Sequence, residues 1–327
     1  MRIAITGATG HIGSNLCPYL LERGHNLKLL VYESSVNYSD AQVVRGSVLE
    51  PETVFKLVQD VDVVVHLAAK ISLEPDKTGE LRAVNVQGTQ NVVDACLGAG
   101  VKQLIHFSSI HTFDPYPLEE PLDESRGYME AGTDYDYSKI EGEKIVVNAQ
   151  ERGLVSTILC PTSVFGPNDF QPSLLGSAIM DMHDGKVPML VPGGYDFVDV
   201  RDIVEATYQA IVQEPKGEKY LLAGKYLSIQ ELAKIVGELS HKNISQRVAP
   251  IGLLKRLLPL FRVQSWLTGK PPIFTEQSLK ALMEGHQDVR ADKAQKDLGY
   301  TRSDIKQSLS ETINWFLSQR EAAKRPR

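Results

Sequence analysis

Tyr135 and Lys139 are two residues that could carry out acid–base chemistry, because of their types and their spacing. A tyrosine hydroxyl can donate a proton to an oxygen that gains negative charge, but its ordinary pKa of about 10 must fall before it works near neutral pH. Residues four positions apart share one helix face, so we expect the Lys139 ammonium to lower the pKa of Tyr135. In a chain with 12 tyrosines, such a pair arises by chance roughly once. Its position gives it weight, because it follows an apolar run and opens a helix-like segment, 138–150.

Two serines, Ser108 and Ser109, end the apolar run 103–108. Ligands of open parallel sheets bind at the carboxyl ends of the strands, so a hydroxyl here could hold a substrate carbonyl oxygen beside the tyrosine. Adjacent serines at a strand end are also common turn formers. We favour the functional interpretation because it accompanies the Tyr/Lys pair and a glycine turn.

That turn contains Gly7, Gly10 and Gly13, which follow an apolar run at 2–6 and lead into a helix-like segment. Glycines at this spacing allow a tight turn, close approach to a diphosphate and close helix packing, while the helix N-terminus supplies N–H donors. A plain turn is the alternative. The strand-turn-helix context favours a dinucleotide site.

The choice between NAD and NADP stays open. An acidic residue at the end of the second strand would bind a ribose 2'-hydroxyl, whereas a cationic residue would bind a 2'-phosphate. The sequence has Val31, Tyr32 and Glu33 at this position, and Glu33 would oppose a phosphate if its side chain faced inward. Ser34, Ser35 and Arg45 could accept one.

Short apolar runs alternate with helix-period segments in the first half. The expected strands are 2–6, 27–32, 61–67 and 103–108. The expected helices are 12–23, 52–59, 84–99 and 138–150. Uniformly apolar strands joined by helices predict an α/β fold, a doubly wound, Rossmann-type parallel sheet covered on both faces.

The alternation breaks down after residue 165, which predicts a smaller substrate-binding domain. We expect residues 1–165 to form the dinucleotide-binding domain, with a strand-helix-strand return over about 195–225. Residues 166–194 and 226–327 would form the substrate domain. Within it, the apolar segment 251–267 could cover an apolar pocket, lie on a membrane surface or form a core helix interrupted at Pro259.

Composition excludes several classes of protein. A net charge of −6 creates no field that would attract nucleic acid. The cysteines, Cys17, Cys96 and Cys160, lie far apart in apolar sequence without neighbouring histidines, so we expect free thiols, no metal site and a reducing compartment. No apolar stretch reaches the ~20 residues of a transmembrane helix, and no secretory signal opens the chain. A cytoplasmic protein is expected.

At this point the chain resembles the extended short-chain dehydrogenase/reductase superfamily over nearly its whole length. The segments that carry the resemblance are TGATGHIG at 6–13, HLAA at 66–69, NVQGTQN at 85–91, FSS at 107–109, YDYSK at 135–139, PTSVFGP at 161–167 and FVDVRD at 197–202. The resemblance implies a catalytic Ser109, Tyr135 and Lys139, in which the serine polarises the carbonyl, the tyrosine transfers the proton and the lysine binds the nicotinamide ribose.

The resemblance and the motifs together predict the residues that bind the cofactor, NAD or NADP. They are Gly7, Gly10, His11, Ile12, Gly13, Tyr32, Leu67, Ala68, Ala69, Asn85, Lys139, Pro161 and Val164. The chain departs from the usual pattern at Asp134, where a proline usually precedes the tyrosine, at Ser47, where an aspartate often follows glycine, and at Tyr32. These departures affect the cofactor assignment and not the chemistry.

Within the superfamily, HLAAKIS, HFSSIH and the C-terminal sequence look more like dihydroflavonol-4-reductase-like and 3β-hydroxysteroid-dehydrogenase-like proteins. We therefore expect an NAD(P)-dependent oxidoreductase that reduces a carbonyl, or oxidises the alcohol, of a relatively apolar small molecule. The alternative is a nucleotide-sugar epimerase or dehydratase with the same triad, for which Lys186, Arg247 and Arg290 could bind a second diphosphate. A catalytically silent cofactor sensor would not need all three triad residues. A homodimer is a candidate assembly by analogy with the superfamily.

Overall fold

The computed structural model describes residues 1–34, 38–72, 74–213, 217–256, 258 and 276–324. Its large sheet has seven parallel strands in the order β3-β2-β1-β4-β5-β6-β9. They are β1 (Arg2–Thr6), β2 (Asn26–Val31), β3 (Ala41–Arg45), β4 (Val63–His66), β5 (Gln103–Phe107), β6 (Ser156–Pro161) and β9 (Lys219–Leu222). The order reverses between β1 and β4, which is where doubly wound sheets bind dinucleotides. The predicted α/β, Rossmann-type fold is confirmed.

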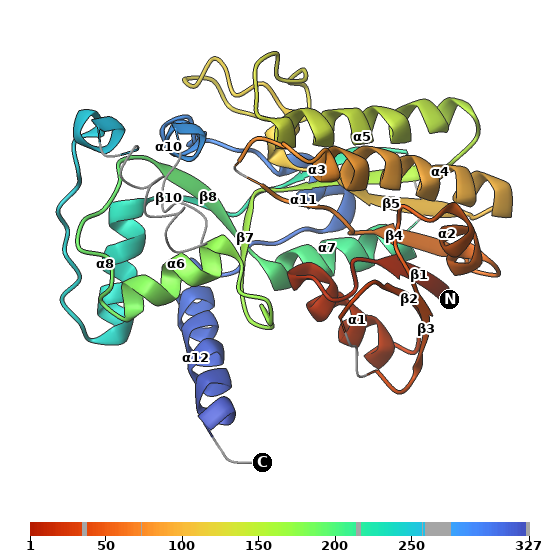
Figure 1. The fold of residues 1–327 in the computed structure, drawn as a ribbon, viewed down its shortest axis with the longest axis horizontal. Helices are drawn as coiled ribbons and strands as arrows, with labels where there is room; N and C mark the ends of the chain where they lie inside the picture. The colour runs from red at the N-terminus through yellow and green to blue at the C-terminus, as the bar shows by residue number, and fades with distance from the viewer. Residues whose placement is uncertain (35–37, 73, 214–216, 257, 259–275, 325–327) are drawn as a thin grey trace.

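Helices cover both faces of this sheet (Figure 1). On one face α2, α4 and α5 pack together, and on the other α1, α7 and α11. Their bounds are α1 (His11–Glu22), α2 (Pro51–Val58), α4 (Gly88–Ala99), α5 (Asp134–Glu151), α7 (Val200–Val212) and α11 (Asp292–Leu298). Short helical turns precede α4 and α5, namely α3 (Glu80–Arg82), the π-helix η1 (Ala83–Gln87) and the 3-10 helix η2 (Ile110–Thr112). Apolar side chains from these helices and the strands form one large core.

A second, three-stranded sheet, in the order β10-β8-β7, continues from the large one. Its strands are β7 (Ser163–Phe165), β8 (Gly194–Asp199) and β10 (Lys225–Ser228), and its helices are α6 (Leu174–His183), α8 (Ile229–Ser240) and α12 (Ile305–Lys324). The expectation that the strand near residue 195 returns to the large sheet is wrong. Phe165 of β7 and Phe197 of β8 pack edge to face in a separate core with α6, α8 and α12. Of the expected strand-helix-strand segment, α7 and β9 pack with the large sheet.

The C-terminal part divides between the two cores. α10 (Glu276–Met283) packs near β8, while Val289, Ala294 and Leu298 belong to the large core. Residues 289–300 therefore lie against the large sheet, which differs from the domain division expected from the sequence. Leu254 and Leu258 are buried with Leu279 and Leu282. Residues 251–256 are helical, and residues 257 and 259–267 of the apolar segment 251–267 lie outside the described residues. None of the helices within the described ranges is long and apolar enough to cross a membrane.

Candidate active site

The turn between β1 and α1 requires glycine at two positions. Gly7 has a φ of +72°, and a Cβ there would lie 2.7 Å from the backbone nitrogen of Ala68. A Cβ on Gly13 would lie 2.4 Å from the Gly7 carbonyl oxygen. α1 begins without a side-chain cap and without an acidic residue in its first turn, so its first N–H groups are available to an anion. This cradle fits the diphosphate of a dinucleotide.

The end of β4 lies beside this turn. The Thr6 hydroxyl is hydrogen-bonded to His66 Nδ1 (2.7 Å) and accepts from the Ala68 amide (3.2 Å). The following segment is held by Asn85 in η1, which exchanges two hydrogen bonds with the Lys70 backbone and donates to Ser138 Oγ at 2.8 Å. Leu67 and Ala68 are half-buried and Ala69 is exposed. The π-helical turn thus ties the loop after β4 to α5.

The other predicted cofactor residues come from three separate segments. His11 Nε2 donates to the Pro167 carbonyl at 3.0 Å, which joins the start of α1 to the loop after β7. Ile12 and Val164 are half-buried and Pro161 is buried at the end of β6. Tyr32 is 67% exposed at the end of β2. Arg45 pairs in register with Val31, so it lies at the same edge as Tyr32.

The predicted catalytic residues come together at the carboxyl end of β5. Ser109 caps η2, and its side chain is hydrogen-bonded to the side chain of Tyr135. The helix that carries Tyr135 begins at Asp134, four residues earlier than the sequence indicates, because Thr133 and Asp136 form a capping box. Lys139 is buried one turn further on, and its Nζ donates to the Phe107 carbonyl at 2.7 Å. Ser138 Oγ, by contrast, points back to the Tyr135 carbonyl.

Electrostatics around the pair differ from the expectation. Burial raises the pKa of Tyr135 to about 12, although the hydrogen bond with Ser109 lowers it. Burial also lowers the pKa of Lys139, to about 8. The direction for Tyr135 is opposite to the expected effect of Lys139, because burial is the largest influence on each group.

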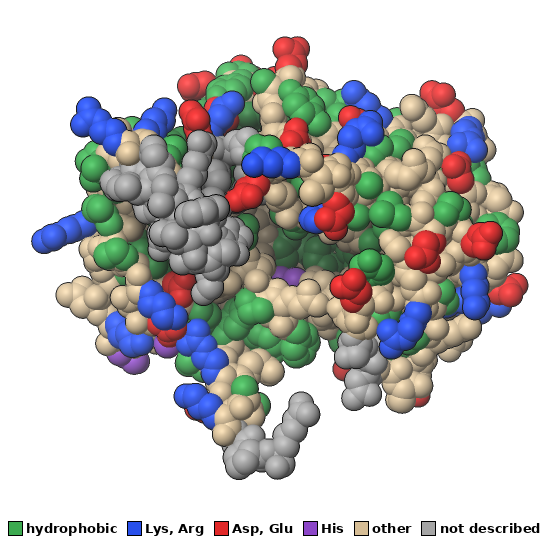
Figure 2. Space-filling view, in the orientation of Figure 1, with side chains coloured by type: hydrophobic (Ala, Val, Ile, Leu, Met, Phe, Trp, Pro, Cys, Tyr) green, Lys and Arg blue, Asp and Glu red, His purple; other side chains and the backbone are tan. Residues whose placement is uncertain are grey.

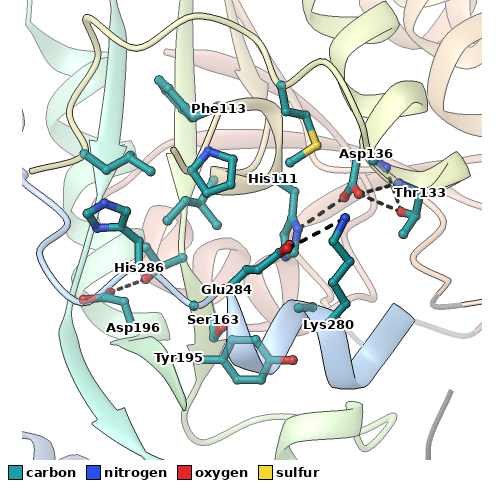
Figure 3. A pocket seen from close by; sticks show the side chains of 18 of the residues that line it. His111, Phe113, Thr133, Asp136, Ser163, Tyr195, Asp196, Lys280, Glu284 and His286 are labelled. Atoms are coloured by element: carbon teal, nitrogen blue, oxygen red, sulfur yellow. Dashed lines mark hydrogen bonds and ion pairs between the residues drawn. The ribbon is translucent and has the colours of Figure 1, made fainter. Parts of the chain in front are cut away.

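A pocket of about 210 Å³ opens beside these residues, between the large sheet, β8 and α10. Its wall is mainly apolar and includes Ile110, Phe113, Leu122, Met129 and Tyr195. Figure 3 shows these elements around the pocket, and Figure 2 shows a hollow near the centre of the face, with hydrophobic side chains on its visible wall. The pocket therefore offers a mainly apolar volume lined by residues that flank Ser109 and Tyr135 in the chain.

Two residues at this pocket were not found from the sequence. His111 Nδ1 lies 3.2 Å from the Asp136 carboxylate, and its ring lies edge-on to that of Tyr135 with centroids 5.9 Å apart. Burial raises the pKa of Asp136, but the hydrogen bonds from His111 and Thr133 outweigh it and hold that pKa below its usual value. Asp136 lies inside YDYSK and His111 follows FSS, so proximity to the motifs was the available signal.

The cations proposed for a second diphosphate lie elsewhere. Lys186 pairs with Asp184 at 2.8 Å and Arg290 with Asp288 at 2.8 Å, both on exposed surface, and Arg247 is exposed. Among the described residues that line the pocket, Lys280 is the one lysine or arginine, and its Nζ lies 3.8 Å from Glu284.

The glycine cradle at the reversal of strand order and the helix with Tyr135 and Lys139 define a class, the dinucleotide-dependent enzymes of the extended short-chain dehydrogenase/reductase type. The model of the NAD dependent epimerase/dehydratase family matches residues 3–223. The chain belongs to this family, and it is an enzyme that uses NAD or NADP.

Individual proteins within and around this family are similar to the chain over most of its length. The chain is 30% identical to sterol demethylase protein B of Methylococcus capsulatus, over 97% of this chain and 98% of that one. It is 28% identical to 3beta-hydroxysteroid-dehydrogenase/decarboxylase isoform 1 of Arabidopsis thaliana, over 93% and 73%. Among solved structures, that of gox2253 is 28% identical with a TM-score of 0.83, over 97% and 98%. The expected resemblance to the superfamily and to 3β-hydroxysteroid-dehydrogenase-like proteins is confirmed.

Proposed function

We propose that this enzyme interconverts a secondary alcohol and a ketone on a largely apolar small molecule, with NAD or NADP as the hydride carrier. The observation that carries the proposal is the mainly apolar pocket lined by the immediate neighbours of Ser109 and Tyr135, among them His111, whose ring lies edge-on to that of Tyr135. The names of the two curated relatives, a sterol demethylase protein and a hydroxysteroid dehydrogenase/decarboxylase, support hydroxysteroids as the first substrates to test.

Each proposed catalytic residue has a separate task. Ser109 would donate to the substrate oxygen and hold it beside Tyr135. Tyr135 Oη would give its proton to that oxygen as the ketone becomes an alkoxide, or take it during oxidation. Lys139 would bind the ribose hydroxyls of the dinucleotide and hold positive charge near Tyr135. The bound dinucleotide supplies or accepts the hydride.

Thirteen residues would hold the dinucleotide. Gly7, Gly10 and Gly13 would receive its diphosphate, together with His11 and Ile12 at the start of α1. The segment Leu67–Ala69 would contact its adenosine half, and Asn85 would keep that segment in place. Tyr32 would lie at the adenine ribose, and Lys139, Pro161 and Val164 at the nicotinamide half.

The test is cofactor turnover over a panel of hydroxysteroids, simple secondary alcohols and their ketones. Tyr135→Phe should lower kcat/KM for the best substrate about 10²- to 10⁴-fold. Tyr137→Phe is the matched control, because this tyrosine is 41% exposed on the same helix, and it should retain activity. Turnover by Tyr135→Phe at the wild-type rate would refute the assignment.

A nucleotide-sugar epimerase or dehydratase is the second candidate, and its support is the family itself. Such a substrate brings a second diphosphate, which needs cations in the pocket. The mainly apolar wall, with Lys280 near Glu284, argues against it. Stabilisation of the protein by UDP-sugars in a thermal shift measurement would favour the epimerase over the dehydrogenase.

The division of labour between the two halves is also a proposal. Residues 1–165 with α7 and β9 would bind the dinucleotide, and the substrate would lie where residues 110–136 of this part meet Tyr195, Asp196 and residues 280–286 of the second part. A homodimer stays a prediction, which sedimentation of the purified protein would test.

A further inference from the structure

A buried carboxylate lies below the candidate active site, on the helix that carries Tyr135 and Lys139. Glu143 follows Lys139 by four residues on α5, and its side chain is 1% exposed. Residues at this spacing share one helix face. Tyr135, Lys139 and Glu143 thus form a row that runs from the pocket into the core.

Four donors from four segments satisfy this carboxylate. Ser108 Oγ after β5 donates to it, Thr112 Oγ1 of η2 donates at 3.2 Å, and Tyr128 OH donates at 2.9 Å. Lys219 Nζ of β9 completes the set at 2.6 Å and also lies 3.7 Å from the ring centroid of Phe113. An ion pair this deep is costly to form and weak evidence for stability, so its presence calls for another reason.

The Glu143 carboxylate influences the pKa of Lys139. Burial is the largest influence on Lys139 and lowers its pKa, whereas the negative charge of Glu143 acts in the opposite direction. The Cys160 thiol is itself hydrogen-bonded to Ser108, which donates to Glu143. Ser108 therefore links the surroundings of Lys139 to the ion pair.

The other titratable groups that face Lys139 are neutral. Burial lowers the pKa of His66 on β4 to about 3 and that of His106 on β5 well below its usual value. Burial raises the pKa of Cys160 on β6 and of Tyr128 above their ordinary values. The remaining charged groups near Lys139 are Glu143 and Lys219, which pair with each other at 2.6 Å.

We propose that Glu143 is a positioning residue for the reaction: paired with Lys219, it keeps the ammonium of Lys139 charged and in place. The proposal rests on the proposed function of Lys139 as the cofactor-binding cation. Without the Glu143 charge, Lys139 would share this region with the half-buried ammonium of Lys219 and with no carboxylate to offset it. Lys139 would then lose its proton at a lower pH and bind the dinucleotide less well near neutrality.

The first test is a double-mutant cycle on the full chain that needs neither cofactor nor substrate. Wild type, Glu143→Gln, Lys139→Met and the double variant are unfolded in urea at pH 7 and at pH 9.5. Loss of the carboxylate should raise the unfolding equilibrium constant about tenfold more when Lys139 is present than when methionine replaces it. This difference should shrink at pH 9.5, where Lys139 is largely neutral.

The second test measures a pH profile that a merely structural role would not move. The dissociation constant for NADH, followed by nicotinamide fluorescence, should rise with pH as Lys139 loses its proton, and Glu143→Gln should move this inflection about one pH unit lower. In Glu143→Gln/Lys219→Met, which removes both charges of the pair, part of the shift should be recovered. Glu141→Gln is the control, because Glu141 is exposed on the same helix and pairs with Arg82.

Two results would overturn the proposal. One is an equal cost of Glu143→Gln with and without Lys139, and the other is an unmoved NADH inflection. Full turnover by Tyr135→Phe would refute the proposed function instead and leave the double-mutant cycle interpretable, so the two failures can be told apart.

Discussion

The replacement Lys139→Met tests whether the buried ammonium of Lys139 lowers the free energy of unfolding of the protein. The Lys139 side chain is buried on α5 and has one hydrogen bond, to the Phe107 carbonyl. A methionine has a similar length, carries no charge and fills irregular apolar space well. We expect the variant to lose activity and to be at least as stable as wild type at pH 7.

The magnitude follows from the two pKa values of Lys139. Burial lowers the pKa from 10.5 to about 8, a difference of about 2.5, and each unit is worth about 1.4 kcal/mol, so the buried ammonium costs about 3 kcal/mol. Because the folded-state value is the lower one, the full cost applies below pH 8. It falls as the pH rises from 8 to 10.5 and is absent above that. Replacement by methionine removes this cost, but it also leaves the Phe107 carbonyl without a hydrogen bond, which destabilises the variant by about 1–3 kcal/mol.

Urea unfolding between pH 6.5 and 9.5 measures this effect. The free energy of unfolding of Lys139→Met should exceed that of wild type by about 1 kcal/mol at neutral pH, and the gap should close above pH 8. Lys234→Met is the control, because this lysine is exposed on α8, and its gap should not depend on pH. A Lys139→Met protein that is less stable than wild type by an amount independent of pH would refute the reasoning.

Three further outcomes are expected. Gly13→Ala should abolish NADH binding and lower stability, since its Cβ would lie 2.4 Å from the Gly7 carbonyl oxygen, whereas Gly127→Ala, with open space around its Cβ, should bind NADH normally in a fluorescence titration. Arg45→Ala should weaken NADPH binding about tenfold with little effect on NADH, because a charge-assisted hydrogen bond to the 2'-phosphate would be lost; equal effects on both nucleotides would contradict this. Thr133→Ala should cost about 1 kcal/mol and lower kcat by loosening the first turn of α5, while Thr133→Ser retains both.

The sequence predicts those parts of the fold that bury the most apolar surface. β1, β4 and β5 are buried along most of their length, so their apolar runs are continuous and their expected bounds match the structure within two residues. β3 gives no such signal, because Val44 is its one buried residue at the sheet edge. The sequence places the start of α5 too late, because its first turn resembles a polar loop unless the Thr133–Asp136 capping box is recognised.

Some residues of the candidate site can also be predicted from the sequence, and others cannot. Gly7 and Gly13 follow from backbone geometry that only glycine allows, and a short motif carries that requirement. The pocket wall draws on separate segments near Ile110, Leu122, Tyr195 and Lys280, and no local pattern brings such residues together. Their approach depends on the step from β6 to β7, where Thr162 alone separates the large sheet from the small one.

The charges below the site explain why its lysine and tyrosine behave differently from the simple helical pair. In an isolated helix, an ammonium one turn from a tyrosine would lower the pKa of the hydroxyl. Here burial acts on both groups at once, so Tyr135 holds its proton more tightly and Lys139 holds its own less tightly. A site of this kind needs a charge deeper in the protein to offset the loss of hydration, and Glu143 is the carboxylate in the described structure that can do so. Glu143 therefore acts on the site through Lys139, whose charge would hold the dinucleotide beside Tyr135.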